Sequence, residues 1–217
     1  MAVAVAEASE ATGQLGGTLR INTPGIAART LIAPRLARFH QAHPNVLLDI
    51  VVDDALADIV RGRFDAGIRV GGRLEKDVVA VRLTPDLNMV AVASPDYLAH
   101  RGTPKTPAEL QHHACINWRL QMDGRPYRWE FQERGQPLEI AVDGPVVTNH
   151  PDIGIAAALQ GIGIAYHFER EGVGELLAEG RLVQVLADWS ISRPGLFLYY
   201  PNRQYRPAAL GAFIDCL

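Results

Sequence analysis

The alternation of apolar, β-branched runs with segments of helical periodicity constrains the fold of this chain most. Leu19 and Ile21 alternate with polar residues, which predicts a strand, and Thr23-Pro24-Gly25 ends it. Apolar residues then recur at helical spacing as far as His43-Pro44, which predicts an amphipathic helix. Because a proline fits in or near the first turn of a helix, Pro34 predicts that the helix either starts around Thr30 or tightens there.

Two more predicted strands follow this helix and complete a repeating unit. Residues 46–52 form a nearly continuous apolar run, and residues 64–70 form another before Gly71-Gly72. Asp53 and Asp54 between them are N-cap candidates for a short helix that ends at Gly62. The order β-α-β-α-β is typical of an α/β protein with a doubly wound parallel sheet.

The rest of the chain continues as a mixture of short strands and helices. Strand-like segments are 78–83, 87–93, 115–118, 127–131, 138–142, 146–147, 162–166, 182–186 and 196–200. Helical segments follow Ser94-Pro95, Thr106-Pro107 and Asn149-His150-Pro151, and others cover 173–178 and 207–217.

Length and composition set the class of protein. A chain of 217 residues is expected to form one large domain or two small lobes. Its 48% hydrophobic and 21% charged residues argue against a disordered or fibrous chain. The formal net charge of -3 excludes a broadly basic surface, so we expect no specific duplex DNA binding by this chain alone.

The cysteines and the apolar runs bear on the compartment. Cys115 and Cys216 are too far apart for a disulfide framework or a zinc motif, which favours a reduced, cytoplasmic protein. No apolar run approaches the roughly 20 residues that span a bilayer. The opening Met1-Ala-Val-Ala-Val-Ala6 has no basic leader, and it makes a poor signal peptide.

Catalytic and metal constellations receive weak support. There is no Gly-x-Ser-x-Gly elbow. Cys115 lies near His112 and His113, but a cysteine in an apolar strand is more often a small buried hydrophobe than a nucleophile. His150, Asp152 and His167 are candidate metal ligands, although an ordinary loop histidine at a helix start is favoured. We therefore expect no catalytic residue, no metal and no cofactor.

Glycine and aromatic patterns also have simpler interpretations. The segment Gly67–Gly72 lacks the spacing of a dinucleotide fingerprint, and Gly161-Ile-Gly163 stands between a helix and a strand, so Gly161 is interpreted as a helix C-cap. Tyr127, Trp129 and Phe131 alternate as on a nucleic-acid stacking platform. Without basic neighbours, a strand with one aromatic face in the core is favoured.

Small or polar residues follow the predicted strands repeatedly. In open α/β sheets, ligands bind beyond the carboxyl ends of the strands, where helix N-termini offer N–H groups to carboxylates or hydroxyls. Each loop by itself can be no more than a well-capped connection, but five such loops favour a binding site. They contain Thr23-Pro24-Gly25, Asp53-Asp54, Arg69-Val70-Gly71, Ser94 and Thr148-Asn149.

An ordered series of motifs resembles the effector-binding region of LysR-type transcriptional regulators. In chain order they are Gly17-Thr-Leu-Arg-Ile21, Leu31-Ile-Ala-Pro34, Phe39-His-Gln-Ala-His-Pro44, Val46-Leu-Leu-Asp-Ile50, Asp54 with Asp58-Ile-Val, Phe64-Asp-Ala-Gly-Ile-Arg69, Ala93-Ser-Pro-Asp-Tyr-Leu98, Gly102-Thr-Pro104 with Pro107-Ala-Glu-Leu110, Gly161-Ile-Gly-Ile-Ala165 and Leu176-Leu-Ala-Glu-Gly-Arg-Leu-Val183. Each motif is weak alone, but together they cover nearly all of residues 17–217.

The resemblance implies a fold like that of type 2 periplasmic binding proteins. Two Rossmann-like α/β lobes would be joined by a hinge of two crossing strands, with a small-molecule effector between them. Lobe I would comprise 17–92 plus 194–217, and lobe II 93–193. Residues 1–16 would be the tail of a linker, and the winged helix-turn-helix of the family would lie outside this chain, as in a regulatory fragment or a stand-alone effector domain.

The resemblance also implies, position by position, which residues contact the effector. They are Thr23, Pro24, Asp53, Arg69, Val70, Ser94, Trp118, Thr148, Asn149 and His167. Two of them depart from the family pattern, because Asp53 replaces a small hydroxyl residue and His167 replaces a proline. An acid there disfavours a simple anionic effector unless Arg69 or Arg119 offsets it, and it suits hydroxyls or an amine.

The function implied is a ligand-sensing regulatory domain that is not an enzyme. An effector that contacts both lobes would shift the domain to a closed form and alter paired DNA-binding heads. A homodimer, or a tetramer in the intact regulator, is expected, with the helix near 28–42 at the interface. A transport-type solute-binding protein of the same fold and an enzyme built on the lobes are the alternatives.

Overall fold

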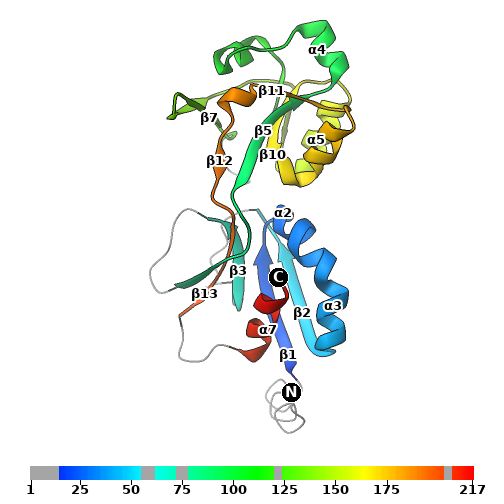
Figure 1. Cartoon of the computed structure of the whole chain (residues 1–217), viewed down its shortest axis with the longest axis vertical. Coiled ribbons are helices and arrows are strands. Elements are labelled where there is room, and N and C mark those ends of the chain that lie inside the picture. Colours follow the sequence, from blue (N-terminus) through cyan, green and yellow to red (C-terminus); the bar gives the residue numbers. More distant parts are fainter. Residues whose placement is uncertain (1–14, 55–61, 72–77, 120–123, 203–206) are drawn as a thin grey trace. The chain divides into compact units, whose positions relative to one another are not determined.

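The chain forms two compact units, each with its own sheet. The computed structural model describes residues 15–54, 62–71, 78–119, 124–202 and 207–217. Unit 1 comprises the chain up to Pro85 together with Pro194–Leu217, and unit 2 comprises Asp86–Arg193. Figure 1 shows the elements of both units.

The sheet of unit 1 has five strands in the order β2-β1-β3-β13-β4. β1 pairs in parallel with β2 and β3, whereas β13 is antiparallel to β3 and β4. The parallel β-α-β start predicted from the sequence is therefore confirmed; the helix expected at 53–62 lies largely outside the described residues. The bounds are β1 Gly16–Thr23, β2 Asn45–Val52, β3 Ala66–Val70, β4 Val78–Arg82 and β13 Leu196–Pro201.

The first helical segment starts earlier than its proline suggested. It begins with α2 (Gly25–Ala27), and Pro34 lies inside the continuous helical stretch that ends with α3 (Leu36–Ala42). A π-helical turn over Ala28–Ile32 and a 3-10 turn over Ala33–Arg35 accommodate the proline. The expected start around Thr30 was wrong, but the alternative, a tightening of the helix at the proline, is confirmed by the 3-10 turn. Changes of helical type can absorb a missing N–H donor and the bulk of the ring.

Helices α3 and α7 (Ala208–Cys216) pack together in unit 1 (Figure 1). The rings of Phe39 and Phe213 meet edge to face at 5.7 Å between centroids. Both side chains are buried, as are Leu19 and Ile21 of β1. Burial of such apolar side chains supplies most of the stabilisation of a unit of this size.

The main sheet of unit 2 follows the order β11-β5-β10-β6-β9. β10, β6 and β9 are parallel, and β5 is antiparallel to β10, β11 and β12. The strands are β5 Leu87–Ala93, β6 Cys115–Trp118, β9 Val146–Thr148, β10 Ile164–Phe168, β11 Val183–Val185 and β12 Ser192–Arg193, with the hairpin β7 Trp129–Glu133 and β8 Gln136–Ile140. The helices are α4 Pro95–Arg101, α5 Pro151–Leu159 and α6 Gly174–Ala178, with 3-10 turns Pro107–His112 and Ala187–Trp189 and a π turn Glu169–Val173.

Successive residues of the central strands of unit 2 alternate between two apolar cores. On β6, Cys115 joins a core with Trp129 and Phe131 of the hairpin, and Ile116 joins the core beneath α5. Period-two alternation of this kind places one side chain on each face of a sheet. The core interpretation of Trp129 and Phe131 is confirmed, and both are buried.

Two short segments connect the units. Near one of them, the Leu196 N–H donates to Thr84 Oγ1 at 2.8 Å. The sequence-based division assigned residues 86–92 to lobe I, but they belong to unit 2 because all partners of β5 lie there. The chain therefore passes between units before β5 rather than after it.

Candidate functional site

The carboxyl ends of the parallel strands of unit 1 carry three of the expected effector contacts. Thr23 is the last residue of β1, is fully buried, and donates from Oγ1 to the Pro24 carbonyl at 3.3 Å. Pro24 precedes α2 with an extended backbone. Asp53 follows β2, is exposed, and donates its backbone N–H to the Thr23 carbonyl at 3.0 Å. Parallel pairing of β1 and β2 brings these residues together at the carboxyl ends of the strands.

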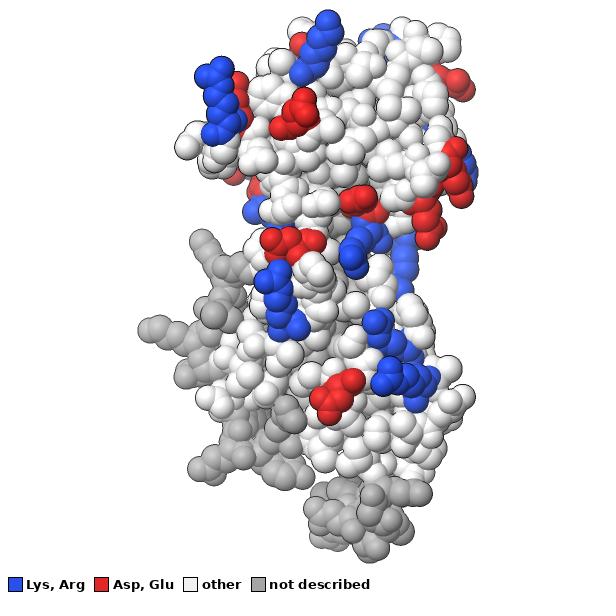
Figure 2. All heavy atoms as spheres, viewed as in Figure 1, with Lys and Arg blue, Asp and Glu red and all other residues white. Residues whose placement is uncertain are grey.

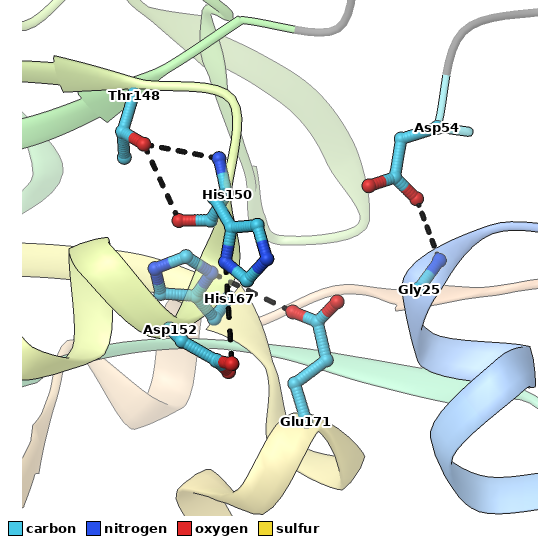
Figure 3. A network of polar contacts seen from close by, with 7 residues as sticks. All are labelled: Gly25, Asp54, Thr148, His150, Asp152, His167 and Glu171. Carbon is cyan, nitrogen blue, oxygen red and sulfur yellow. Dashed lines mark hydrogen bonds and ion pairs between the residues drawn. The ribbon is translucent and has the colours of Figure 1, made fainter. Parts of the chain in front are cut away.

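Asp54 lies at the N-terminus of α2, the helix that precedes it in the sequence. The backbone N–H of Gly25, at the start of α2, donates to Asp54 Oδ1 at 2.9 Å (Figure 3). A carboxylate at a helix N-terminus satisfies an orphan donor and favours the helix dipole. Position in the sequence predicts capping of the next helix, which lies largely outside the described residues. Parallel pairing of β1 and β2 also brings Asp54 to the preceding helix.

Arg69 and Val70 end β3 at the same edge. The Arg69 guanidinium donates to the Ile68 carbonyl at 2.6 Å and also to Asn22 Oδ1. Burial lowers the pKa of Arg69, and the negative charges of Asp53 and Asp54 oppose this by raising it. Arg69 is therefore a guanidinium held within its own unit.

Three expected contacts of unit 2 lie in one row across neighbouring strands. Trp118 pairs with Thr148 in the β6–β9 ladder. Ile164 pairs with Cys115 in the β10–β6 ladder, so His167 continues the same row beside Trp118. Residues of one row in a parallel sheet point to the same face, which for this row is the face covered by α5.

The loop that leads into α5 is fixed by its own polar groups. Thr148 Oγ1 accepts from the His150 N–H at 3.0 Å and donates to the His150 carbonyl at 3.4 Å (Figure 3). His150 Nδ1 lies 4.0 Å from Asp152 Oδ2 in the first turn of α5. Asn149, between Thr148 and His150, is exposed. The structure thus places Thr148 in the turn and leaves the Asn149 side chain at the surface.

His167 lies within β10, not after the strand as expected, and is 4% exposed. Its Nδ1 is 3.5 Å from Glu171 Oε2 (Figure 3). Its Nε2 would be 2.5 Å from a Cβ at Gly154 of α5. Sequence reasoning missed both neighbours; the available signals were a glycine inside a predicted helix and an acid four residues after the histidine.

Ser94 caps helix α4 of unit 2. Its Oγ accepts from the Tyr97 N–H at 3.3 Å at the start of α4, as the Ser-Pro pair predicted. Ser94 is buried. Its hydroxyl therefore has a structural task at this helix start.

An aromatic pair stands at the end of β6. The rings of Trp118 and Tyr127 are 5.0 Å apart, and the buried Trp118 Nε1 has no hydrogen-bond partner among the described residues. Tyr127 accepts from Arg193 Nη2 at 3.3 Å, and Arg193 forms an ion pair with Glu130. Burial raises the pKa of Tyr127, although Arg193 opposes the shift.

The catalytic and metal alternatives gain no support. Burial raises the pKa of Cys115 to about 12, so its thiol stays protonated at neutral pH. In the part of the chain that the structure describes, no group of three histidine, cysteine or acidic side chains could hold a metal ion.

None of the described helices is long and apolar enough to cross a bilayer. Figure 2 shows acidic and basic side chains intermingled on the face in view.

Several curated proteins are similar to this chain over most of its length. YcaN of Escherichia coli K12, an uncharacterized HTH-type transcriptional regulator, is 40% identical over 199 residues, which are 92% of this chain and 64% of that protein. PgrR of the same organism, an HTH-type transcriptional regulator, is 36% identical over 214 residues, 99% of this chain and 71% of that protein. The chain thus spans about two thirds of the length of these relatives, which are named transcriptional regulators and not enzymes.

Solved structures share the fold at low identity. Full-length AphB, a virulence activator of Vibrio cholerae, matches with a TM-score of 0.80 and 22% identity over 99% of this chain and 73% of that one. CrgA, a LysR-type transcriptional regulator of Neisseria meningitidis, matches with a TM-score of 0.79 and 23% identity over 98% of this chain and 72% of that one. The expected two-lobe fold, like that of periplasmic binding proteins, is therefore confirmed.

A family description agrees with these likenesses. The family model described as the LysR substrate binding domain matches residues 12–217, nearly the whole chain. This chain belongs to the LysR substrate-binding domain family, the regulatory domains of LysR-type transcriptional regulators.

Proposed function

We propose that this domain binds a small-molecule effector at the strand ends of both units and transmits the binding to DNA-binding heads outside this chain. The observation that carries the proposal is the gathering of expected contacts at one edge of each sheet. In unit 1 these are Thr23, Asp53 and Arg69, and in unit 2 they are Thr148, Trp118 and His167. Ligands of open α/β sheets bind at such strand ends.

The mechanism proposed is a shift between two arrangements of the units. An effector that contacts both units favours the arrangement in which both sets of contacts are made. A coupling free energy of about 1–3 kcal/mol changes an equilibrium about 5- to 150-fold, which suffices to alter DNA binding by attached heads. A transport-type solute receptor has the same fold, but the curated relatives are named as transcriptional regulators, which supports a regulatory function. A regulator of this kind would act in the cytoplasm.

We further propose a homodimer whose interface contains the exposed apolar side chains on the outermost strand of each sheet. β2 is an edge strand of unit 1, with Leu47 63% and Val52 55% exposed. β9 is an edge strand of unit 2, with Val147 40% exposed, and Ile153 of α5 nearby is 55% exposed. Exposed apolar edge strands favour pairing with another chain. The resemblance places the helix near 28–42 in this interface, and Leu36 on α3 is also exposed.

Thermal denaturation with a panel of small metabolites tests the site. We expect at least one compound to raise the melting temperature of the native chain, and Thr23→Val and Asn149→Leu to weaken that shift. Thr18→Val, an exposed position near the opposite end of β1, is the matched control. The assignment fails if no compound stabilises the chain while both site variants keep full regulation in the intact regulator.

A further inference from the structure

Both segments that connect the units leave unit 2 at one pair of residues. Unit 2 begins at Asp86 and ends at Arg193, and Arg193 pairs with Leu87 in the antiparallel β12–β5 ladder. The ladder continues inside unit 2, where the Met89 N–H donates to the Ile191 carbonyl at 3.0 Å. Because backbone hydrogen bonds join the two strands of a ladder, a displacement of the Arg193 backbone acts on both connecting segments at once.

The side chain of Arg193 is held by two groups that lie on or just before strand β7. Its Nη2 donates to the Tyr127 hydroxyl oxygen at 3.3 Å, and the same nitrogen forms an ion pair with Glu130 of β7. The Arg193 and Glu130 side chains are partly buried. One nitrogen therefore serves two acceptors, so the position of each acceptor affects where the guanidinium lies.

Glu130 is the fixed acceptor of the two. Its backbone carbonyl accepts from the Tyr166 hydroxyl, and Trp129, the residue before it, stacks on the Tyr166 ring at 5.2 Å between centroids. Trp129 and Tyr166 are buried in the core of unit 2. Because a close-packed core resists displacement, Glu130 is a stationary anchor for Arg193.

Tyr127 is the acceptor that is joined to an expected effector contact. Its N–H donates to the Trp118 carbonyl at 2.7 Å, and its ring lies 5.0 Å from the Trp118 ring. Both residues are only partly buried, and Trp118 is the last residue of β6, paired with Thr148 of β9. A ligand that contacts the Trp118 indole therefore also restrains the Tyr127 ring.

These contacts form a continuous series within unit 2. The series passes from the Trp118 ring to the Tyr127 ring, from the Tyr127 hydroxyl to the Arg193 guanidinium, and along the Arg193 backbone to β5. Coupling between separated sites needs packed groups that have two discrete arrangements. Here one arrangement has Arg193 held by Tyr127 and Glu130 together, and the other has Arg193 held by Glu130 alone.

We infer that Trp118, Tyr127 and Arg193 form a relay through which effector binding at unit 2 tightens the β12–β5 ladder, where both connecting segments begin. The inference rests on the proposed function, because it assigns regulation to that same site. Trp118 contacts the effector, and Tyr127 and Arg193 are positioning residues that act through it. An effector that fixes the Trp118 ring fixes Tyr127 as well, so Arg193 keeps both acceptors and the ladder opens less often.

Hydrogen exchange of the purified chain tests the relay without a ligand. Mass spectrometry of peptides that cover 86–89 and 190–193 reports the opening of the β12–β5 ladder. Trp118→Leu and Tyr127→Phe should each speed exchange in these peptides about 3- to 10-fold, the effect of losing roughly one hydrogen bond. The double variant should exchange no faster than Tyr127→Phe alone, because Trp118 acts through the hydroxyl that is missing.

Two further variants separate the relay from a general loss of stability. Arg193→Met removes the guanidinium at the other end of the relay, and Trp118→Leu should have no additional effect in that background. Tyr97→Phe is the matched control, because the Tyr97 hydroxyl accepts from the Ala114 N–H at 3.0 Å, away from Arg193. This control also loses a hydroxyl from unit 2, and it should leave exchange of 190–193 unchanged.

The same measurement with a ligand tests the direction of the effect. The probes are the common amino acids, dicarboxylates, polyamines and monosaccharides, ranked by the rise in melting temperature that each produces. The compound that stabilises the native chain most should slow exchange of 190–193 in the native chain and not in Tyr127→Phe.

Contrary results separate the relay from the proposed function. The relay is overturned if Trp118→Leu does not speed exchange, or if its effect persists undiminished in the Tyr127→Phe and Arg193→Met backgrounds. Equal slowing by the ligand in the native chain and in Tyr127→Phe overturns it as well, and each of these results leaves the proposed function standing. A panel in which no compound raises the melting temperature counts against the proposed function itself, and the relay falls with it.

Discussion

His167 and Gly154 are in close contact across the sheet–helix interface of unit 2, where a Cβ at Gly154 would lie 2.5 Å from His167 Nε2. The imidazole is buried and is held from its other side by Glu171, so it has little freedom to move. The absence of a side chain at Gly154 therefore decides whether α5 can lie over the end of β10.

Gly154→Ala should destabilise unit 2 by about 1–3 kcal/mol. The overpacking cost exceeds the gain of about 1 kcal/mol that alanine brings inside a helix. Urea denaturation followed by circular dichroism measures the change. Gly174→Ala in α6, where the nearest atom to a Cβ is at 3.5 Å, is the control and should be neutral or stabilising by up to about 1 kcal/mol. In a His167→Ala background the Gly154→Ala penalty should disappear; a penalty that persists there contradicts the proposed contact.

Asp54→Ala should cost about 1 kcal/mol of stability, because the Gly25 N–H loses its acceptor. The effect belongs to unit 1, so hydrogen exchange of the first turns after Pro24 should accelerate. Asp54→Asn keeps an acceptor oxygen and should retain most of the stability. Equal losses for the alanine and asparagine variants would show that charge, and not the cap, matters there.

The two cysteines should differ in reactivity towards a disulfide reagent at about pH 8. Cys115 is fully buried with a pKa raised to about 12, whereas Cys216 is partly exposed. One thiol should react in the native chain and a second only after denaturation, since the thiolate is the reactive form. Cys216→Ser should remove the fast-reacting thiol. Two fast thiols in the native chain would contradict the burial of Cys115.

The pKa of Cys115 also predicts a pH dependence of stability. Burial raises it from 9.0 to about 12, so above pH 9 the unfolded thiol loses its proton while the folded one keeps it. The contribution of this group to folding is therefore lost as pH rises above 9. The stability difference between the native chain and Cys115→Ala should narrow by about 1 kcal/mol from about pH 8.5 to about pH 10. A constant difference would exclude this linkage.

Leu47→Glu should weaken the proposed dimer. A charge on the exposed edge strand β2 opposes burial of this edge in an interface. Analytical ultracentrifugation should show at least a tenfold rise in the dimer dissociation constant, equal to about 1.4 kcal/mol. The control is Val183→Glu on β11, where the valine is also exposed. β11 is the outermost strand of the unit 2 sheet on the side away from β9, which belongs to the proposed interface. Equal effects of both variants would place the interface elsewhere.

The sequence by itself determined the parallel β-α-β start, the alternation that buries Trp129 and Phe131, and the family. Period-two and helical patterns are local, so they are readable from Leu19, Ile21 or Ile116 without a structure. Helix caps that use adjacent residues, such as Ser94 on α4, were readable for the same reason.

Only the tertiary structure decided which distant side chains meet. Asp54 caps the helix before it, and His167 lies against Gly154, because strand pairing and sheet–helix packing bring residues together across tens of positions. The chain passes from unit 1 to unit 2 before β5 because β5 pairs with β10, β11 and β12. These partners lie far along the sequence, so the local pattern of β5 does not reveal its unit. Local patterns specify elements, whereas the partners of a strand edge or a helix end depend on long-range packing that no short window of sequence contains.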